Sequence, residues 1–240
     1  MVDVIKDGTP ESQRIYARRE MEELEAPLAK LCGQLAEGFR EGKYALIIGD
    51  DTSGRIPTLV IRGFANHLRK QQGQREIPTI FLDLSKDTDV MGIADQLKKR
   101  VPESDSRSGN RALLVTEWMN SGGTMARALQ MLSDRKGIAA DVVTLGTSPV
   151  YDRGFHKQEL SYRSAEVFSG DLKMSPSIYQ NVAVSGLMGE WKDGTRTIKP
   201  IARTFRGYQK WVNESRGDVN LMVQRIVAQV FPTEQTQQAA

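Results

Sequence analysis

Residues 113–126, LLVTEWMNSGGTMA, constrain the fold more than any other part of the sequence. The segment starts with three consecutive apolar residues, as a buried parallel strand does. A polar, glycine-rich loop follows, and apolar residues then recur at helical spacing from Met125 onward. At such a junction the glycines let backbone N–H groups turn toward an anion, and the helix start adds N–H groups and a positive dipole end. The segment therefore predicts a phosphate site.

Two common glycine-rich phosphate loops do not match this segment. The Walker loop requires a lysine before its final Ser or Thr, and no lysine occurs between Arg111 and Arg135. The dinucleotide fingerprint G-x-G-x-x-G is also missing, because only the adjacent pair Gly122 and Gly123 is present. The alternatives are a phosphate loop of another family or a plain strand-to-helix turn.

Another strand–loop–helix junction lies earlier in the chain. The strand-like run at residues 44–48, YALII, leads into the loop GDDTSGR at residues 49–55. Pro57 then opens a helical pattern that extends to about residue 70, and proline is well suited to a first helical turn. A capped helix start, in which Asp and Ser side chains only satisfy backbone N–H groups, is the alternative to a phosphate loop.

The loop at residues 49–55, which is the first of the two loops along the chain, has side chains suited to phosphate. Gly54 would let the backbone approach a ligand, Thr52 and Ser53 can donate hydrogen bonds, and Arg55 offers a forked cation. Its aspartates are poor direct phosphate ligands, but they can reach magnesium through water. We therefore expect this loop to contact phosphate oxygens and a magnesium ion.

Strand and helix patterns alternate along the first two thirds of the chain. Further strands are expected at residues 80–84 and 141–145, with a helix at 90–101 between them. Intervals of roughly 30 residues between strands are typical of right-handed βαβ crossovers. The sequence therefore predicts an α/β fold with a parallel sheet, in which both loops lie at the carboxyl edge where α/β proteins bind ligands.

Helices are also expected at both ends of the chain. An amphipathic pattern predicts one helix over residues 12–40, and division into two helices at Pro27 is the alternative. Two further helices are predicted at residues 202–213 and 219–230. We expect four regions: an N-terminal helical segment (1–43), an α/β core (44–150), a C-terminal extension (151–231) and a disordered tail (232–240).

The segment around Glu117 resembles the motif that binds phosphoribosyl pyrophosphate (PRPP) in type I phosphoribosyltransferases. That motif is an apolar strand, two acidic residues, three variable residues, then Thr or Ser, Gly, a variable residue and Thr. Glu117 stands at the second acidic position, and residues 121–124 stand at the phosphate-binding end. Thr116 departs from the motif, because it replaces the first acid. The resemblance implies a three-layer core with a parallel sheet and a C-terminal hood that selects the base.

The resemblance also implies an activity, which is the transfer of a 5-phosphoribosyl group from PRPP to a nitrogenous base or related nucleophile, with release of pyrophosphate. Glu117 and Arg55 would be catalytic, and Glu117 would also contact Mg²⁺. Ser53, Gly54 and Arg55 would hold the pyrophosphate, and residues 120–124 would hold the 5-phosphate. The implied substrate-binding residues are Asp51, Thr52, Ser53, Gly54, Arg55, Thr116, Glu117, Asn120, Ser121, Gly122, Gly123 and Thr124.

Thr116 leaves other functions open, because it can donate a hydrogen bond but carries no negative charge. One alternative is a protein that senses PRPP or another ribose 5-phosphate-containing nucleotide without catalysis. Another is a regulatory protein that contacts nucleic acid through the basic run at residues 192–216. A net charge of +3 does not decide between these alternatives, and the sequence also leaves a homodimer open.

Composition argues against several other protein classes. No apolar run approaches the roughly 18 residues that a membrane span needs, and the first residues lack an apolar signal core. A single cysteine, Cys32, rules out an intrachain disulfide. The two histidines, His67 and His156, lie far apart without cysteine partners, so no transition-metal site is expected. These features predict a cytoplasmic protein.

Overall fold

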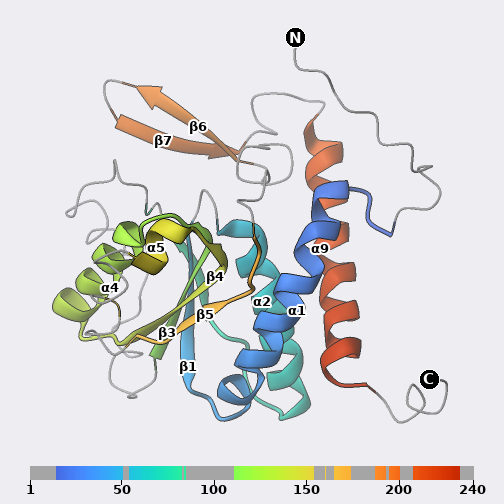
Figure 1. The fold of residues 1–240 in the computed structure, drawn as a ribbon. Coiled ribbons are helices and arrows are strands. Elements are labelled where there is room, and N and C mark those ends of the chain that lie inside the picture. Colours follow the sequence, from blue (N-terminus) through green and yellow to red (C-terminus); the bar gives the residue numbers. More distant parts are fainter. Residues whose placement is uncertain are drawn as a thin grey trace.

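The computed structural model has a parallel β-sheet with helices on both faces (Figure 1). The α/β fold and the parallel sheet predicted from the sequence are therefore confirmed. The structure describes residues 15–50, 54–82, 84, 111–153, 160, 165–173, 187–192, 195–200 and 208–232. The predicted helix at 90–101 and residues 233–240 of the predicted tail lie outside these ranges.

Five strands form the sheet in the order β2-β1-β3-β4-β5, and all neighbouring pairs are parallel. The strands are β1 (Tyr44–Asp50), β2 (Thr79–Leu82), β3 (Arg111–Met119), β4 (Ala140–Thr147) and β5 (Val167–Ser169). From β1 the chain moves outward to β2 and then returns to the other side of β1 with β3. Open α/β sheets bind ligands at the carboxyl ends of the strands where the order reverses in this way. Here that point lies between β1 and β3, which carry the two predicted phosphate loops.

The helices and the sheet form three layers (Figure 1). The described helices are α1 (Arg19–Arg40), α2 (Arg55–Gln71), α4 (Gly123–Lys136), α5 (Pro149–Arg153) and α9 (Tyr208–Val230). α1, α2 and α9 cover one face of the sheet, and α4 covers the other. Side chains of β1 alternate between the two layers, because Ile47 packs with the first group of helices and Ile48 packs with α4.

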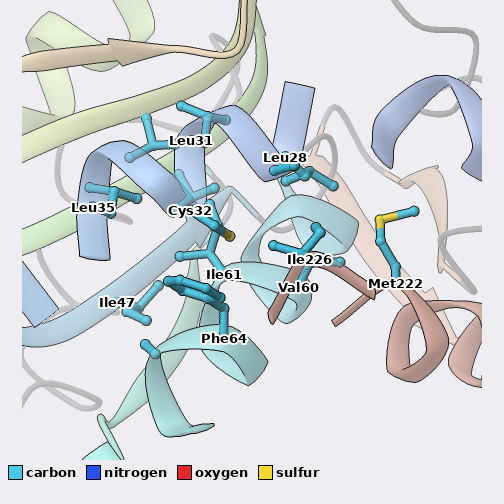
Figure 2. Packing of buried hydrophobic residues seen from close by; sticks show 14 of the residues in the cluster. Leu28, Leu31, Cys32, Leu35, Ile47, Val60, Ile61, Phe64, Met222 and Ile226 are labelled. Atoms are coloured by element: carbon cyan, nitrogen blue, oxygen red, sulfur yellow. The ribbon is translucent and has the colours of Figure 1, made fainter. Parts of the chain in front are cut away.

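The larger core lies where α1, α2 and α9 meet above the sheet. Figure 2 shows Cys32 of α1, Phe64 of α2 and Met222 of α9 within one apolar cluster. Burial raises the pKa of the Cys32 thiol, so this side chain stays neutral and packs as a small apolar residue. The final helix therefore belongs to the core although the sequence placed it in a C-terminal extension.

The helices at both ends of the chain are uninterrupted. α1 is one continuous helix of 22 residues with Pro27 inside it, which confirms the single predicted helix and not its division at Pro27. Proline has no N–H to donate to the carbonyl of Glu23, but Glu23 is exposed and water can replace that donor. At the other end of the chain, the two helices predicted at 202–213 and 219–230 are replaced by the single helix α9, with the exposed Gly217 in its interior.

The region after residue 150 contributes to the sheet and also forms a separate hairpin. β5 is the fifth strand of the main sheet, whereas β6 (Leu187–Lys192) and β7 (Thr195–Pro200) pair with each other in antiparallel orientation. Figure 1 shows this hairpin beyond the carboxyl ends of the main strands. In the described part of the chain, none of the helices is long and apolar enough to cross a membrane.

A buried carboxylate joins the starts of four strands at the opposite, amino edge of the sheet. Asp141 of β4 is 1% exposed. Its Oδ1 accepts hydrogen bonds from the Arg111 guanidinium at 2.6 and 3.0 Å and from the backbone N–H of Glu166 at 3.0 Å. The Tyr44 hydroxyl donates to its Oδ2 at 3.0 Å, and the ammonium of Lys43 lies 3.1 Å from the same oxygen. These donors begin or precede β1, β3 and β5, so this carboxylate fixes their relative positions.

We expect Asp141→Asn to destabilise the fold by about 2–3 kcal/mol, because it removes the charge from the hydrogen bonds with the half-buried Arg111 and Lys43. Burial alone would raise the pKa of Asp141, but the bonds from the Glu166 N–H, Arg111 and Lys43 outweigh it and lower the pKa. Urea denaturation measures the loss. Glu166→Gln is the matched control, because this exposed carboxylate contacts the same Lys43 and its loss should stay within about 0.5 kcal/mol. Equal losses in both variants would contradict the assigned role.

The pH dependence of stability gives a second test of Asp141. Its folded-state pKa lies below the ordinary value of 3.8, so the unfolded chain binds the proton more tightly. The stabilisation is therefore complete above about pH 4 and is lost as the pH falls through the folded-state pKa. We expect the stability difference between the parent protein and Asp141→Asn to shrink in urea titrations carried from about pH 5 toward pH 2. A difference that stays constant over this range would contradict the assignment.

Candidate functional site

Gly54, at the end of the first loop (residues 49–55), packs directly against β3. Gly54 precedes α2, and a Cβ atom on it would lie 2.4 Å from the carbonyl oxygen of Val115 and 2.9 Å from the backbone nitrogen of Asp50. Its own N–H donates to the carbonyl of Asp50 at 2.8 Å. Because the neighbours are backbone atoms, only glycine fits here without displacing the chain. The two strand–loop–helix junctions, β1 to α2 and β3 to α4, therefore lie together at the carboxyl edge of the sheet. We call this part of the edge the rim.

β3 continues beyond the end of its ladder with β1. The last pair between β1 and β3 is Gly49 with Val115, whereas the pairing of β3 with β4 continues to Met119 and Thr147. The four residues 116–119 add about 13 Å to β3 at 3.3 Å per residue. This extension lies beside Gly54 at the end of the first loop. The second loop (residues 120–124) follows the extension directly.

A residue after β4 holds the second loop in place. The Ser148 hydroxyl lies 2.6 Å from the carbonyl oxygen of Asn120 and 2.9 Å from its Oδ1, and the Ser148 N–H donates to the carbonyl of Met119 at 2.9 Å. Gly122 follows with φ 84°, which glycine adopts without strain. The loop is therefore anchored at its base, while Ser121 is exposed to solvent and Thr124 is half-buried.

The starts of α2 and α4 differ from the start of α1. α2 begins after Gly54 and α4 after Gly122, and neither has a side-chain cap or an acidic residue in its first turn. α1 has two glutamates in its first turn, and Asp218 of α9 accepts hydrogen bonds at 2.8 and 2.9 Å from two backbone N–H groups just before the helix. The protein thus neutralises the positive end of α1 and leaves those of α2 and α4 without a protein anion in their first turns.

The acidic residue of the motif lies beneath the rim. Glu117 is 1% exposed, and both of its carboxylate oxygens are shielded from solvent. Alternation along β3 places its side chain on the face of Val115, which packs with α2. Thr116 is also buried. A ligand can therefore reach the Glu117 carboxylate only after the surrounding chain moves.

Arg55 lies at the β2 side of the rim. It is the first residue of α2, and its guanidinium carbon lies 4.7 Å from the ring centroid of Phe81 in β2. The other predicted phosphate ligands of this loop, Asp51, Thr52 and Ser53, lie outside the described residues. Within the described residues, no group of three His, Cys, Asp or Glu side chains could hold a metal ion. Contact between Glu117 and Mg²⁺ therefore stays a prediction.

Sequence reasoning missed two features beside the second loop. One is Ser148, whose contact with Asn120 joins β4 to the loop. The other is a cavity of about 500 Å³ at the carboxyl ends of β4 and β5, with Thr147, Ser169 and Lys173 in its lining. The polar run GTSP at residues 146–149, which ends β4, was the available sequence signal.

No protein family, curated protein or solved structure matches this chain.

We expect Gly54→Ala to destabilise the protein by about 1–3 kcal/mol, because the new methyl group would overlap the backbone of β3. The matched control is Gly33→Ala in α1, where a Cβ meets nothing within 4 Å. That change should stabilise the helix by about 0.5–1 kcal/mol. Urea denaturation compares the two variants. If Gly54→Ala were as stable as the control, the loop would not be seated on β3.

Proposed function

We propose that this chain is a phosphoribosyltransferase that moves the 5-phosphoribosyl group of PRPP to a nitrogenous base or related nucleophile and releases pyrophosphate. The observation that carries the proposal is that two helices whose first turns contain no acidic residue begin at one rim, where the strand order reverses. PRPP carries a phosphate at one end of its ribose and a pyrophosphate at the other. A ligand of this kind needs two anion sites at a fixed separation, and the close packing of Gly54 on Val115 supports such a separation.

The second loop would hold the 5-phosphate. The left-handed Gly122 turns the chain so that the first N–H groups of α4 point out of the helix end. The hydroxyls of Ser121 and Thr124 add donors beside them. Anchoring by Ser148 holds this loop in position, which lowers the entropy lost on binding.

The start of α2 would hold the pyrophosphate. Gly54 keeps the backbone close to β3, and Arg55 supplies a planar fork that suits phosphate oxygens. Mg²⁺ would neutralise charge on the pyrophosphate and ribose oxygens. Mg²⁺ is usually held by one or two carboxylates together with substrate phosphates and water, so a site that includes Asp50 or Glu117 needs no cluster of three acids.

Glu117 would act on the ribose. With the 5-phosphate and the pyrophosphate held at the two helix starts, the sugar would lie over the extension of β3 at residues 116–119. A carboxylate there would favour the positive charge that develops on the ring as pyrophosphate leaves. Burial strengthens this interaction, because charges interact more strongly where the local dielectric constant is low. The accepting base would then enter the cavity at the ends of β4 and β5, next to the second loop.

A binding protein without turnover is the second candidate. Thr116 supplies no negative charge, and losing one charge-assisted contact costs about 1–2 kcal/mol. The burial of Glu117 also favours this candidate, since the carboxylate contacts ligand only after a rearrangement. The nucleic-acid alternative stays a prediction. Of the basic run at residues 192–216, the structure describes side chains from residue 209 onward. In that part, the Lys210 ammonium lies 3.8 Å from the Glu214 carboxylate.

Labelled PRPP with Mg²⁺ and a panel of nitrogenous bases tests the proposal. An enzyme forms labelled nucleotide, whereas a sensor binds PRPP without product. We expect Glu117→Gln to lower turnover by about 100-fold or more while PRPP affinity changes less. Ser121→Ala should weaken PRPP binding by about 10-fold, because it removes a hydrogen bond to a charged group.

Ser133→Ala is the matched control for the Ser121 variant. Ser133 is an exposed residue of α4 outside the first turn, so its removal should change neither binding nor turnover. A protein that binds no PRPP at millimolar concentration would contradict both candidates. Unchanged turnover in Glu117→Gln would remove that residue from the site.

A further inference from the structure

A second cavity opens between α2 and α9, on the helical face of the sheet. Its volume is about 640 Å³, within the range of small-molecule sites. The two helices touch farther along, where a Cβ on Gly63 would lie 2.7 Å from a methyl carbon of Val223. Toward the start of α2, space remains between the helices. The cavity therefore lies where closely packed helices diverge, beside the core.

The charge of the cavity lining is mainly positive. Arg55, Arg62 and Arg216 contribute three guanidinium groups, and Glu76 contributes one carboxylate. A nitrogen of Arg62 lies 3.5 Å from the Glu76 carboxylate, but these side chains are 43% and 72% exposed, so the pair is weak. The lining residues therefore carry three cations and one anion. Such a lining favours an anionic ligand.

The floor of the cavity combines apolar and hydrogen-bonding groups. Ile56 and Val219 provide buried aliphatic surface. Asn66 accepts a hydrogen bond from the Ile77 N–H through its Oδ1, which leaves its amide NH₂ group as a donor. The Ser215 hydroxyl donates to the carbonyl of Trp211, so its oxygen can still accept. Apolar voids stay empty, but a space lined with guanidinium, amide and hydroxyl groups holds water that a ligand can displace.

We propose that the cavity between α2 and α9 binds an organic phosphate, in which the phosphate contacts the arginines and an apolar or ring-shaped body covers the aliphatic floor. Guanidinium forks match phosphate oxygens, and the floor distinguishes an organic phosphate from the inorganic ion. This site is separate from the rim at the ends of β1 and β3, although Arg55 belongs to the rim and also lines the cavity. Binding there does not require the rim to bind PRPP.

Titration of the ¹⁵N-labelled full chain with AMP, UMP and phenyl phosphate tests the proposal, with adenosine and inorganic phosphate as controls. We expect at least one organic phosphate to shift amide signals of Leu59, Val212 and Asn220, and to bind about 10-fold more tightly than either control. Arg62→Gln and Arg216→Gln should each weaken that binding by about 5- to 10-fold. The Arg62 side chain is 43% exposed and Arg216 is exposed, so melting temperatures should change little.

Arg69→Gln is the matched control variant, because Arg69 belongs to the same helix but bonds Gln74 outside the cavity. Equal weakening in this variant would indicate non-specific attraction and overturn the proposal. Signal shifts confined to residues 120–125 would place the ligand on the rim, which overturns this inference and leaves the proposed function standing. Binding that is as tight for inorganic phosphate, or no binding by any of the three probes at millimolar concentration, would also overturn it.

Discussion

The contact between Gly54 and the Val115 carbonyl sets the geometry of the carboxyl edge. It seats the start of α2 against β3 at the level where the β1 ladder ends, while β3 itself continues to Met119. α2 lies on one face of the sheet and α4 on the other, so their positive ends approach the same rim from opposite sides (Figure 1). A ligand that contacts both must cross the end of β3. This requirement favours an elongated molecule with an anionic group at each end.

Positively charged and hydrogen-bond-donating groups have different partners at the two edges of the sheet. At the amino edge, the Asp141 carboxylate is surrounded by donors that hold four strands in register. At the start of α1, Asp218 accepts two backbone N–H groups, although burial outweighs these bonds and Arg18 and raises the pKa of its carboxyl group. At the rim, the helix starts have no comparable acid in their first turns. Carboxylates therefore neutralise positive groups where they support the fold, whereas the first turns of α2 and α4 contain no acidic residue at the edge where α/β proteins bind ligands.

Local patterns explain which features could be predicted from the sequence. The runs around Ile47 and Leu114 are apolar and short, and glycine-rich loops follow them, so the strands, the parallel sheet and the two junctions were recognisable. The extension of β3 was not, because TEWM is not an apolar run and becomes a strand by pairing with β4. The uninterrupted α1 depends on packing that outweighs the effect of Pro27. The burial of Glu117 and the anchoring by Ser148 arise from segments distant in sequence, and local patterns do not contain such contacts.

The burial of residues 116 and 117 offers a physical reason for the departure from the motif. Thr116 and Glu117 are 3% and 1% exposed, so a second carboxylate here would place two negative charges in adjacent buried positions. Each buried ion costs several kcal/mol unless a cation or hydrogen bonds compensate it. Threonine at the first position avoids this cost. Under the proposed function, a ligand would have to supply the free energy that exposes the buried Glu117. Slow turnover or binding without turnover would follow from the same cost.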